Sequence, residues 1–484
     1  MSEKIEELRQ VKIQKLEQLK ALGIDPYPAD SKRTHQIGVA LSSFDDLSAS
    51  KEPVSLVGRI RSIRTHGKLA FFDLEDESGR IQLLFRQEAL NDQFKIIDLL
   101  DLGDFLEAQG VLMLSKTGQK SVEVTSFRLL AKSLLPIPSE HFGLENLETR
   151  LRKRYLDLML NPETRELFRK KAVFWKTIRM FLEEHNFLEV QLNVLEPIPG
   201  GAEAEPFVTH HNALDKDFYL RISLELPLKK LVAGGYEKVF EIGRIFRNEG
   251  ISTEHLQDYS QMEFYWAYSE YNELATFLEE MYKQVIANVT GGLETVYDGK
   301  EIDWGQRWPK IRYFDIFKEK TDLDLNTVSD DELRKFADKE HIKYEKNHGR
   351  GRLIDLIYKK KVRPSLIQPC FLINPPVEIE PLAKKDPKNP KEVQRLQILA
   401  GGTELGKGFS ELNDPMDQRS RFEDQMKLRE AGDPEAQMLD EEYLEAMEYG
   451  MPPMSGFGLS ERLFSVIMDK SIRETNFFPL MKDE

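Results

Sequence analysis

One stretch of the chain, 239–268, carries polar side chains in a pattern that suits an anion and an amine. Residues 239–249 and 260–268 are rich in β-branched and aromatic side chains, which predicts two strands of a hairpin around a polar loop. Because side chains alternate across a strand, one face is apolar, and the other carries Arg247, Glu249, Glu263 and Tyr265. A guanidinium binds phosphate or carboxylate groups, and paired carboxylates bind an amine. The simpler alternative is a half-buried hairpin with a surface ion pair.

A second stretch, LAGGTELGKGFSELNDP at 399–415, combines glycines with two carboxylates. Residues 401–407 match the GxxxxGK pattern of a phosphate-binding loop, but Gly408 stands where that loop needs Ser or Thr, so we exclude it. Glu404 and Glu411 would face opposite ways on a regular strand. A β-bulge at the glycines would bring both carboxylates into one site, where they could hold Mg²⁺. The alternative is two solvated carboxylates that flank a turn.

A third stretch, SGFGLSERLFSVIM at 455–468, places a cation at the start of a predicted helix. Ser460 can cap this helix, and Arg462 falls in its first turn. A cation and the positive end of a helix together favour a phosphate group.

These motifs resemble a known family. FRNEG followed by HLQDYSQMEFYWAY, at about 239–268, resembles motif 2 of the class II aminoacyl-tRNA synthetases, and SGFGLSER resembles motif 3. With IPGGAEAEPFVTHHNALDKDFYLRIS upstream, the chain is similar to class II lysyl-tRNA synthetases nearly end to end. Residues at about 165–197 correspond to motif 1, the dimer-forming helix and strand. The resemblance implies ATP-dependent ligation of L-lysine to tRNA(Lys) through a lysyl-adenylate, by a homodimer.

The resemblance also implies roles for individual residues. The catalytic residues would be Arg247, Glu249 and Arg462. The ATP-binding residues would be Arg247, Glu249, His255, Tyr259, Glu404 and Arg462, with Tyr259 stacked on adenine. The lysine-binding residues would be Gly201, Glu225, Arg247, Glu263, Tyr265, Phe409 and Glu411. Mg²⁺ would be held by Glu404 and Glu411.

Charge supports lysine as the substrate. Glu225 and the backbone at Gly201 would bind the α-amine, Arg247 the carboxylate, and Phe409 would pack along the aliphatic stem. The groups near the ε-amine would be Glu263, Tyr265 and Glu411. A relative that uses aspartate would need Arg or Lys at that end, so this set of acids favours lysine.

Three positions depart from the family pattern. Lys407 replaces a usual Asn that helps to hold the substrate carboxylate. A cation could replace that contact, or could disfavour lysine if it pointed inward. Asn193 replaces the usual proline of motif 1, and the glycine run of motif 3 is one residue shorter.

Four segments are expected along the chain. Residues 1–52 predict a helix at 4–22 and an irregular tether, and 53–133 predict five strands with a helical segment before the fourth, the order of an OB-fold β-barrel. Residues 134–148 are a linker. Residues 149–484 predict an α+β body, which the resemblance identifies as the class II antiparallel-sheet catalytic domain, with a helical insertion at about 320–366.

The predicted barrel is the expected anticodon-binding domain. The resemblance places Arg64, Phe71 and Gln82 against anticodon bases, where Phe71 could stack on a base and Gln82 could bond to a base edge. Core packing is the alternative role of Phe71. The family's usual glutamate on the last strand is Ser126 here.

Composition sets limits on these interpretations. Hydrophobic residues make up 40% of the 484 and charged residues 31%, as in ordinary globular chains. No apolar run has membrane length, and a single cysteine, Cys370, argues for a reducing compartment, so we expect a cytoplasmic protein without a membrane partner. The net charge of −15 does not by itself suggest tRNA, although a local basic patch remains compatible with it.

Two other functions are compatible with this family. One is lysylation of a protein substrate by a paralog, but such paralogs lack the OB domain that this chain is expected to have. The other is a non-catalytic tRNA-binding paralog, which should have lost one of four residues that are present here: Arg247, Glu404, Glu411 and Arg462.

Overall fold

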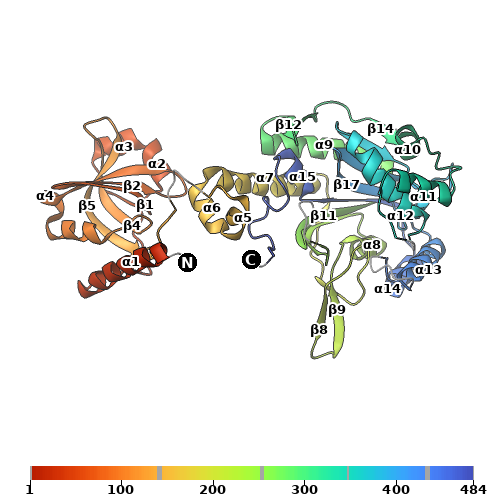
Figure 1. The fold of residues 1–484 in the computed structure, drawn as a ribbon, viewed down its shortest axis with the longest axis horizontal. Helices are drawn as coiled ribbons and strands as arrows, with labels where there is room; N and C mark the ends of the chain where they lie inside the picture. The colour runs from red at the N-terminus through yellow and green to blue at the C-terminus, as the bar shows by residue number, and fades with distance from the viewer. Residues whose placement is uncertain (1–2, 139–143, 251–255, 346–347, 431–435, 483–484) are drawn as a thin grey trace. The chain divides into compact units, whose positions relative to one another are not determined.

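The computed structural model describes residues 3–138, 144–250, 256–345, 348–430 and 436–482. The chain forms two compact units, Met1–Leu144 and Glu145–Glu484 (Figure 1). Each unit has its own hydrophobic core, and each is described by itself.

The first unit is a closed barrel with the strand order β1-β2-β3-β5-β4. Its strands are β1 (Val54–His66), β2 (Leu69–Glu75), β3 (Arg80–Arg86), β4 (Phe105–Leu114) and β5 (Lys120–Ala131). The predicted helical segment appears as α4 (Gln87–Leu90) and a 3₁₀ helix, η1 (Asn91–Leu99). Closure removes unpaired strand edges and encloses an apolar core. The predicted OB-fold barrel is confirmed.

The segment before the barrel is more ordered than the sequence pattern indicated. The N-terminal helix is α1 (Glu3–Ala21), as expected, but the region interpreted as an irregular tether contains α2 (Ile37–Ser42) and α3 (Phe44–Ser50). Both helices are too short for a clear helical period, so their apolar residues were not recognised. Phe44 is 2% exposed and packs with the barrel core, which fixes these helices in place.

The second unit is built on an eight-stranded sheet with the order β14-β15-β16-β17-β18-β11-β10-β6. The strands are β6 (Leu188–Glu189), β10 (Lys238–Phe246), β11 (Asp258–Ala267), β14 (Lys310–Arg312), β15 (Cys370–Ile373), β16 (Arg395–Ala400), β17 (Thr403–Ser410) and β18 (Met454–Ser460). All neighbouring pairs are antiparallel except β10 with β6 and β14 with β15. The predicted α+β body with an antiparallel sheet is confirmed.

Helices cover both faces of this sheet. The apolar face, which includes Phe240, Phe264 and Phe457, packs with α7 (Pro162–Glu184) and α9 (Tyr271–Thr290). The other face, which includes Tyr265 and Phe409, packs with three helices: α8 (Glu225–Ala233), α13 (Pro415–Glu430) and α14 (Glu441–Glu448). The alternation predicted for the hairpin therefore holds, and its polar side lies under α8.

The remaining elements surround this sandwich. Before α7 lie α5 (Leu147–Arg152) and α6 (Arg154–Leu160), and after β18 lies α15 (Arg462–Ile467). A three-stranded sheet contains β7 (Leu195–Glu196), β8 (Val208–His211) and β9 (Lys216–Leu220), and its β8–β9 hairpin projects from the unit (Figure 1). A small hairpin is formed by β12 (Glu294–Tyr297) and β13 (Lys300–Asp303). The helical insertion includes α10 (Tyr313–Thr321), α11 (Asp330–Lys339), α12 (Arg350–Ile357), η2 (Tyr358–Val362) and η3 (Arg363–Ser365), and η4 (Val377–Ile379) follows β15.

Candidate active site

Three adjacent strands of the large sheet place a row of glycines between charged and aromatic side chains, and we call this strip the groove. In register, Glu263 of β11 lies beside Gly458 of β18, which lies beside Lys407 of β17. One row along, Tyr265 lies beside Gly456, which lies beside Phe409. With strands about 4.8 Å apart, side chains on β11 and β17 stand about 10 Å apart with no side chain between them. The register therefore leaves a groove with charged and aromatic walls.

Gly456 is required because its neighbours already fill the space above it. A Cβ atom at this position would lie 2.3 Å from both Oε1 of Glu411 and Cε1 of Tyr265. Because Gly456 has no side chain, Tyr265 and Glu411 can both occupy the space directly above its backbone. The structure brings these two predicted lysine-binding residues together.

Glu263 is held in one orientation by neutral donors. It is 3% exposed, and its Oε1 accepts hydrogen bonds from the Ser223 hydroxyl at 2.8 Å and the Leu224 amide at 3.0 Å. The Tyr265 hydroxyl donates to its Oε2 at 3.3 Å, and the Gln261 side chain donates to Oε1 at 2.5 Å. These four donors fix the orientation of the Glu263 carboxyl group on the groove wall.

Gly201 and Glu225 lie together at the start of α8. Gly201 has φ of +84°, and a Cβ atom there would lie 2.8 Å from Cβ of Glu225 and 3.0 Å from Cβ of Ser223. A side chain would be strained at this angle and would collide with α8. The loop backbone therefore packs closely against Ser223 and the first residue of α8, Glu225.

A buried lysine that the sequence analysis did not single out completes this end of the groove. Lys229 of α8 is 0% exposed, its Nζ lies 2.5 Å from Oε1 of Glu225, and it forms an ion pair with Glu411. Burial opposes the charged form, yet the carboxylates of Glu225 and Glu411 raise the pKa of Lys229 above its ordinary value. The available signal was the i,i+4 spacing of Glu225 and Lys229 on a mostly apolar helix.

The opposite end of the groove carries the two predicted phosphate-binding arginines. β10 ends at Phe246, one residue before Arg247, so Arg247 and Glu249 lie in the loop and not in the strand that was expected. The Arg247 guanidinium donates twice to the Ile222 carbonyl, at 3.3 Å each, and lies 5.7 Å from the Tyr259 ring centroid.

Positively and negatively charged side chains from several elements surround Tyr259 at this end of the groove. Burial raises the pKa of its hydroxyl, while Arg247 and Arg462 lower it and the negative charges of Glu249 and Glu263 raise it. Arg462 begins α15, and the N-cap of this helix is Glu461 and not the predicted Ser460, although the Arg462 amide donates to the Ser460 hydroxyl at 3.3 Å. Gln261, two residues after Tyr259, pairs in register with Ser460, two residues before Arg462, so Tyr259 lies near both arginines. The predicted ATP-binding residue His255 lies outside the described residues.

The predicted β-bulge in β17 is present, but it does not create a shared metal site. The register with β16 shifts at Leu405, so Glu404 faces the same side of the sheet as Lys407 and Phe409. Along the strand, however, Glu404 and Glu411 are separated by about 20 Å. Glu404 accepts a hydrogen bond from Gln397, whereas Glu411 pairs with Lys229. Two carboxylates this far apart would not ligate one Mg²⁺, so this geometry does not support the joint assignment.

Glu404 alone has the character of a cation ligand. Although burial opposes ionisation, Lys407, Arg395 and Arg462 lower the pKa of its carboxyl below the ordinary value. Across the described part of the chain, no cluster of three or more His, Cys, Asp or Glu side chains is arranged to hold a metal. Mg²⁺ is usually bound by one or two carboxylates together with substrate phosphates, and Glu404 fits that mode.

Lys407 lies in the middle of the groove wall, and its ammonium is tethered. Its Nζ lies 3.2 Å from Oε1 and 3.4 Å from Oε2 of Glu380, which also binds Arg395 at 2.7 Å. Its side chain is 46% exposed by surface area, although neighbouring atoms surround it closely enough for burial to oppose its charge. Because Glu380 draws the ammonium, its charge is partly neutralised and is not aimed at Glu411.

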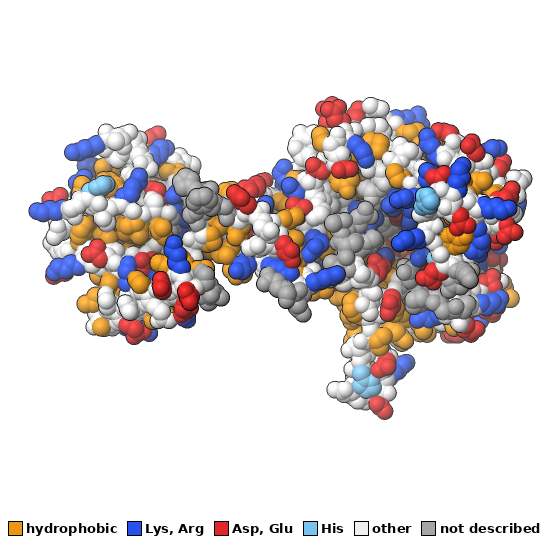
Figure 2. Space-filling view, viewed as in Figure 1, with side chains coloured by type: hydrophobic (Ala, Val, Ile, Leu, Met, Phe, Trp, Pro, Cys, Tyr) orange, Lys and Arg blue, Asp and Glu red, His pale blue; other side chains and the backbone are white. Residues whose placement is uncertain are grey.

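The predicted anticodon residues share one surface of the barrel. Arg64 pairs in register with Phe71, and Gln82 pairs with Asp73 two residues along the same face. Phe71 is half-buried on this face, whereas Phe72 is 0% exposed in the core, so core packing belongs to Phe72. Gln82 is 6% exposed and accepts a hydrogen bond from Ser121 at 3.1 Å, which leaves less of it available for a base. Figure 2 shows basic side chains interspersed with acidic ones on the visible surface.

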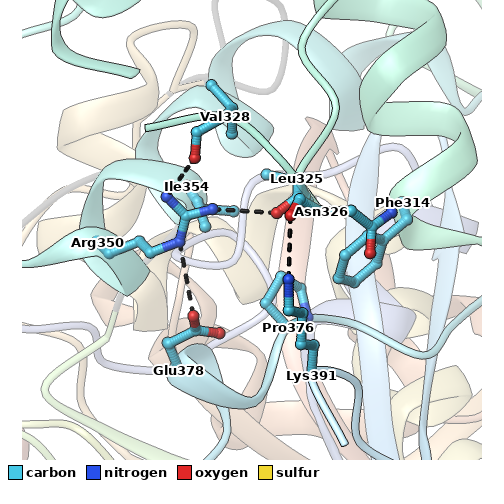
Figure 3. A pocket seen from close by; sticks show the side chains of 9 residues that line it. All are labelled: Phe314, Leu325, Asn326, Val328, Arg350, Ile354, Pro376, Glu378 and Lys391. Carbon is cyan, nitrogen blue, oxygen red and sulfur yellow. Dashed lines mark hydrogen bonds and ion pairs between the residues drawn. The ribbon is translucent and has the colours of Figure 1, made fainter. Parts of the chain in front are cut away.

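A separate cavity of about 270 Å³ lies between the helical insertion and η4 (Figure 3). Arg350 donates to the carbonyl groups of Leu325 at 3.1 Å and Val328 at 2.9 Å, and lies 3.6 Å from Glu378. Lys391 donates to the Asn326 carbonyl at 3.0 Å. These cations are used to join loops, and none of the residues predicted for lysine or ATP lines this cavity.

Comparisons with known proteins agree with this arrangement. Residues 146–482 match the family model described as tRNA synthetases class II (D, K and N), and residues 54–130 match the OB-fold nucleic acid binding domain. The chain is 43% identical to the lysine–tRNA ligase of Roseiflexus castenholzii over 484 residues, which cover 99% of each chain. It is 40% identical to the lysine–tRNA ligase of Bacillus subtilis over 489 residues, which cover 99% of this chain and 98% of the relative. The chain therefore belongs to the lysine–tRNA ligase family of class II tRNA synthetases.

Proposed function

We propose that this chain ligates L-lysine to the 3′ end of tRNA(Lys) in two ATP-dependent steps. The lysine carboxylate attacks the α-phosphorus of ATP, giving lysyl-adenylate and pyrophosphate, and the terminal ribose hydroxyl of the tRNA then accepts the lysyl group. The observation that carries the proposal is the glycine-floored groove, with carboxylates at one end and two arginines at the other.

Each end of the groove matches one part of the reactants. Glu225 and the backbone at Gly201 bind the α-amine, while Glu411 and Tyr265 bind the ε-ammonium. Arg247 neutralises the substrate carboxylate and the α-phosphate, where negative charge develops. No protein nucleophile is needed, because positioning and charge neutralisation account for the first step.

Arg462, Tyr259 and Glu249 form the rest of the proposed nucleotide site. Arg462 holds the γ-phosphate, Tyr259 stacks on adenine, and Glu249 contacts adenine or orders the loop, in line with their convergence around Tyr259. Glu404 is the residue that would hold Mg²⁺ together with phosphate oxygens, and the ion would supply neutralising charge to the leaving pyrophosphate.

We also propose that the chain acts as a cytoplasmic homodimer. Several apolar side chains near motif 1 are exposed in a single chain: Val173 (38%), Met180 (44%), Leu188 (47%), Leu195 (44%) and Val208 (59%). Such a surface is usual where another protein surface binds. None of the helices in the described ranges is long and apolar enough to span a membrane.

Amino-acid-dependent ATP–pyrophosphate exchange, measured over the standard amino acids, tests the proposal. Lysine should support exchange far above aspartate and asparagine, and stronger exchange with either of these would overturn the substrate assignment.

Charging of tRNA(Lys) by Phe71→Ala tests the anticodon-binding role of the barrel. Loss of one stacked base should raise the KM for tRNA about tenfold and leave exchange unchanged. Normal charging in that variant would contradict the role of Phe71.

A further inference from the structure

Lys229 is a buried cation to which the proposed reaction assigns no task. It is 0% exposed, and its ammonium lies between carboxylates from two different elements, Glu225 on its own helix and Glu411 just after β17. The rings of Tyr265 and Phe409 lie 5.7 and 5.3 Å from the ammonium. The same carboxylates and rings are the groups proposed to bind the substrate.

Without a cation between them, two buried carboxylates would not both stay charged. Burial raises the pKa of both Glu225 and Glu411, Glu263 raises that of Glu225 further, Glu225 raises that of Glu411 further, and Lys229 lowers both. Two neighbouring buried carboxylates share a proton when no cation separates them. With Lys229 between them, both carboxylates can stay charged, and each can then attract one of the two ammonium groups of the substrate.

The other charged groups described around this cluster are already bound by partners of their own. Glu263 on β11 is bound by neutral donors, and Glu380 is bound by Arg395 and by Lys407 of β17. Tyr265 and Tyr443 also face the cluster, and burial raises the pKa of each hydroxyl, so both stay neutral near pH 7. Lys229 is therefore the group that sets the charge state of Glu225 and Glu411.

We propose that Lys229 is a positioning residue of the lysine site, which keeps Glu225 and Glu411 ionised so that they can bind the ammonium groups of the substrate. This inference rests on the proposed function and specifies how its amino-acid site selects a cationic side chain. Without Lys229, the two carboxylates hold a proton near neutral pH, and lysine binds well only after that proton leaves. The KM for lysine should then fall as the pH rises.

The test compares Lys229→Met and Lys229→Arg in the full chain by lysine-dependent ATP–pyrophosphate exchange between about pH 6.5 and 9. Lys229→Met should raise the KM for lysine by about tenfold or more at pH 7. This increase should become smaller as the pH rises, and the KM for ATP should stay unchanged. Lys229→Arg should restore most of the affinity. Lys230→Met is the matched control, because Lys230 is on the same helix, lies partly exposed and pairs with Glu442 at 3.0 Å.

A measurement on the unaltered protein keeps the inference testable if Lys229→Met does not fold. Titration calorimetry of lysine binding at pH 7, in buffers of different ionisation enthalpy, should show no net proton release. Release of about one proton per lysine bound would overturn the inference, as would a folded Lys229→Met variant whose KM for lysine is unchanged across pH. A complete lack of lysine-dependent exchange in the unaltered protein would instead overturn the proposed function.

Discussion

The two ends of the groove are built in opposite ways. At the acidic end, Glu225, Lys229 and Glu411 are buried and Lys229 pairs with both carboxylates, so their positions are fixed before any ligand arrives. At the phosphate end, Arg247 is half-buried at the end of a strand, and its guanidinium is held by one backbone carbonyl. The first end is preorganised to select a side chain, whereas the second presents cations to a large, highly charged cosubstrate.

The largest expected effect comes from removing the cation of the phosphate end. Arg247→Ala should lower the rate of ATP–pyrophosphate exchange about 10³-fold or more, because Arg247 is the cation proposed to neutralise the charge that develops at the α-phosphate. Arg244→Ala is the control, since that side chain is 45% exposed and pairs with Asp258 at 2.9 Å. Exchange within about tenfold of normal in Arg247→Ala would show that the α-phosphate lies elsewhere.

The next largest effect should come from filling the floor between the two ends. Gly456→Ala places a methyl group where Glu411 and Tyr265 already lie, at 2.3 Å from each. Displacement of these side chains should reduce kcat/KM for lysine about 10²-fold and leave the KM for ATP nearly unchanged. Gly292→Ala, at a glycine with open space around it, should have no effect. An equal loss of ATP and lysine affinity would mean that the two ends are not independent.

A smaller effect is expected at Lys407, which lies between the ends. Since its ammonium is already paired with Glu380, Lys407→Asn should change kcat/KM for lysine less than about tenfold. The measurement is the same exchange assay with varied lysine. A hundredfold loss would instead assign Lys407 to direct contact with the substrate carboxylate.

The smallest expected effect concerns stability near the acidic end. Burial raises the pKa of Glu196, on β7, to about 8. Its carboxyl takes up a proton on folding between pH 4.5, its ordinary value, and about 8, so it makes stability fall with rising pH across that window, with a slope of up to about 1.4 kcal/mol per pH unit. Glu196→Gln should flatten the decline of Tm over that range. An unchanged pH profile would contradict a protonated Glu196.

Much of this molecule could be predicted from its sequence where periodic patterns are strong. The five barrel strands, α1, α7 and the hairpin of β10 and β11 all follow from alternation or helical spacing, and the groove residues on β11 follow from the same alternation. The bulge in β17 was also anticipated from its glycines.

What could not be predicted depends on register between distant strands and on packing. The separation of about 20 Å between Glu404 and Glu411 follows from strand geometry with one bulge. The residue that pairs with Glu411, however, comes from an element far away in sequence. The role of Lys229 could not be predicted either, because a lysine on a helix is ordinarily exposed. Only the fold shows that it meets Glu411, 182 positions later in the chain. Helices α2 and α3 were missed because they are short.

The most direct test is a crystal structure of the protein with a non-hydrolysable lysyl-adenylate analogue. The analogue should lie in the groove along Gly456 and Gly458, with its ε-ammonium within hydrogen-bond distance of Glu411 and its phosphate mimic within reach of Arg247. An analogue bound in the opposite direction, or outside this groove, would contradict this arrangement.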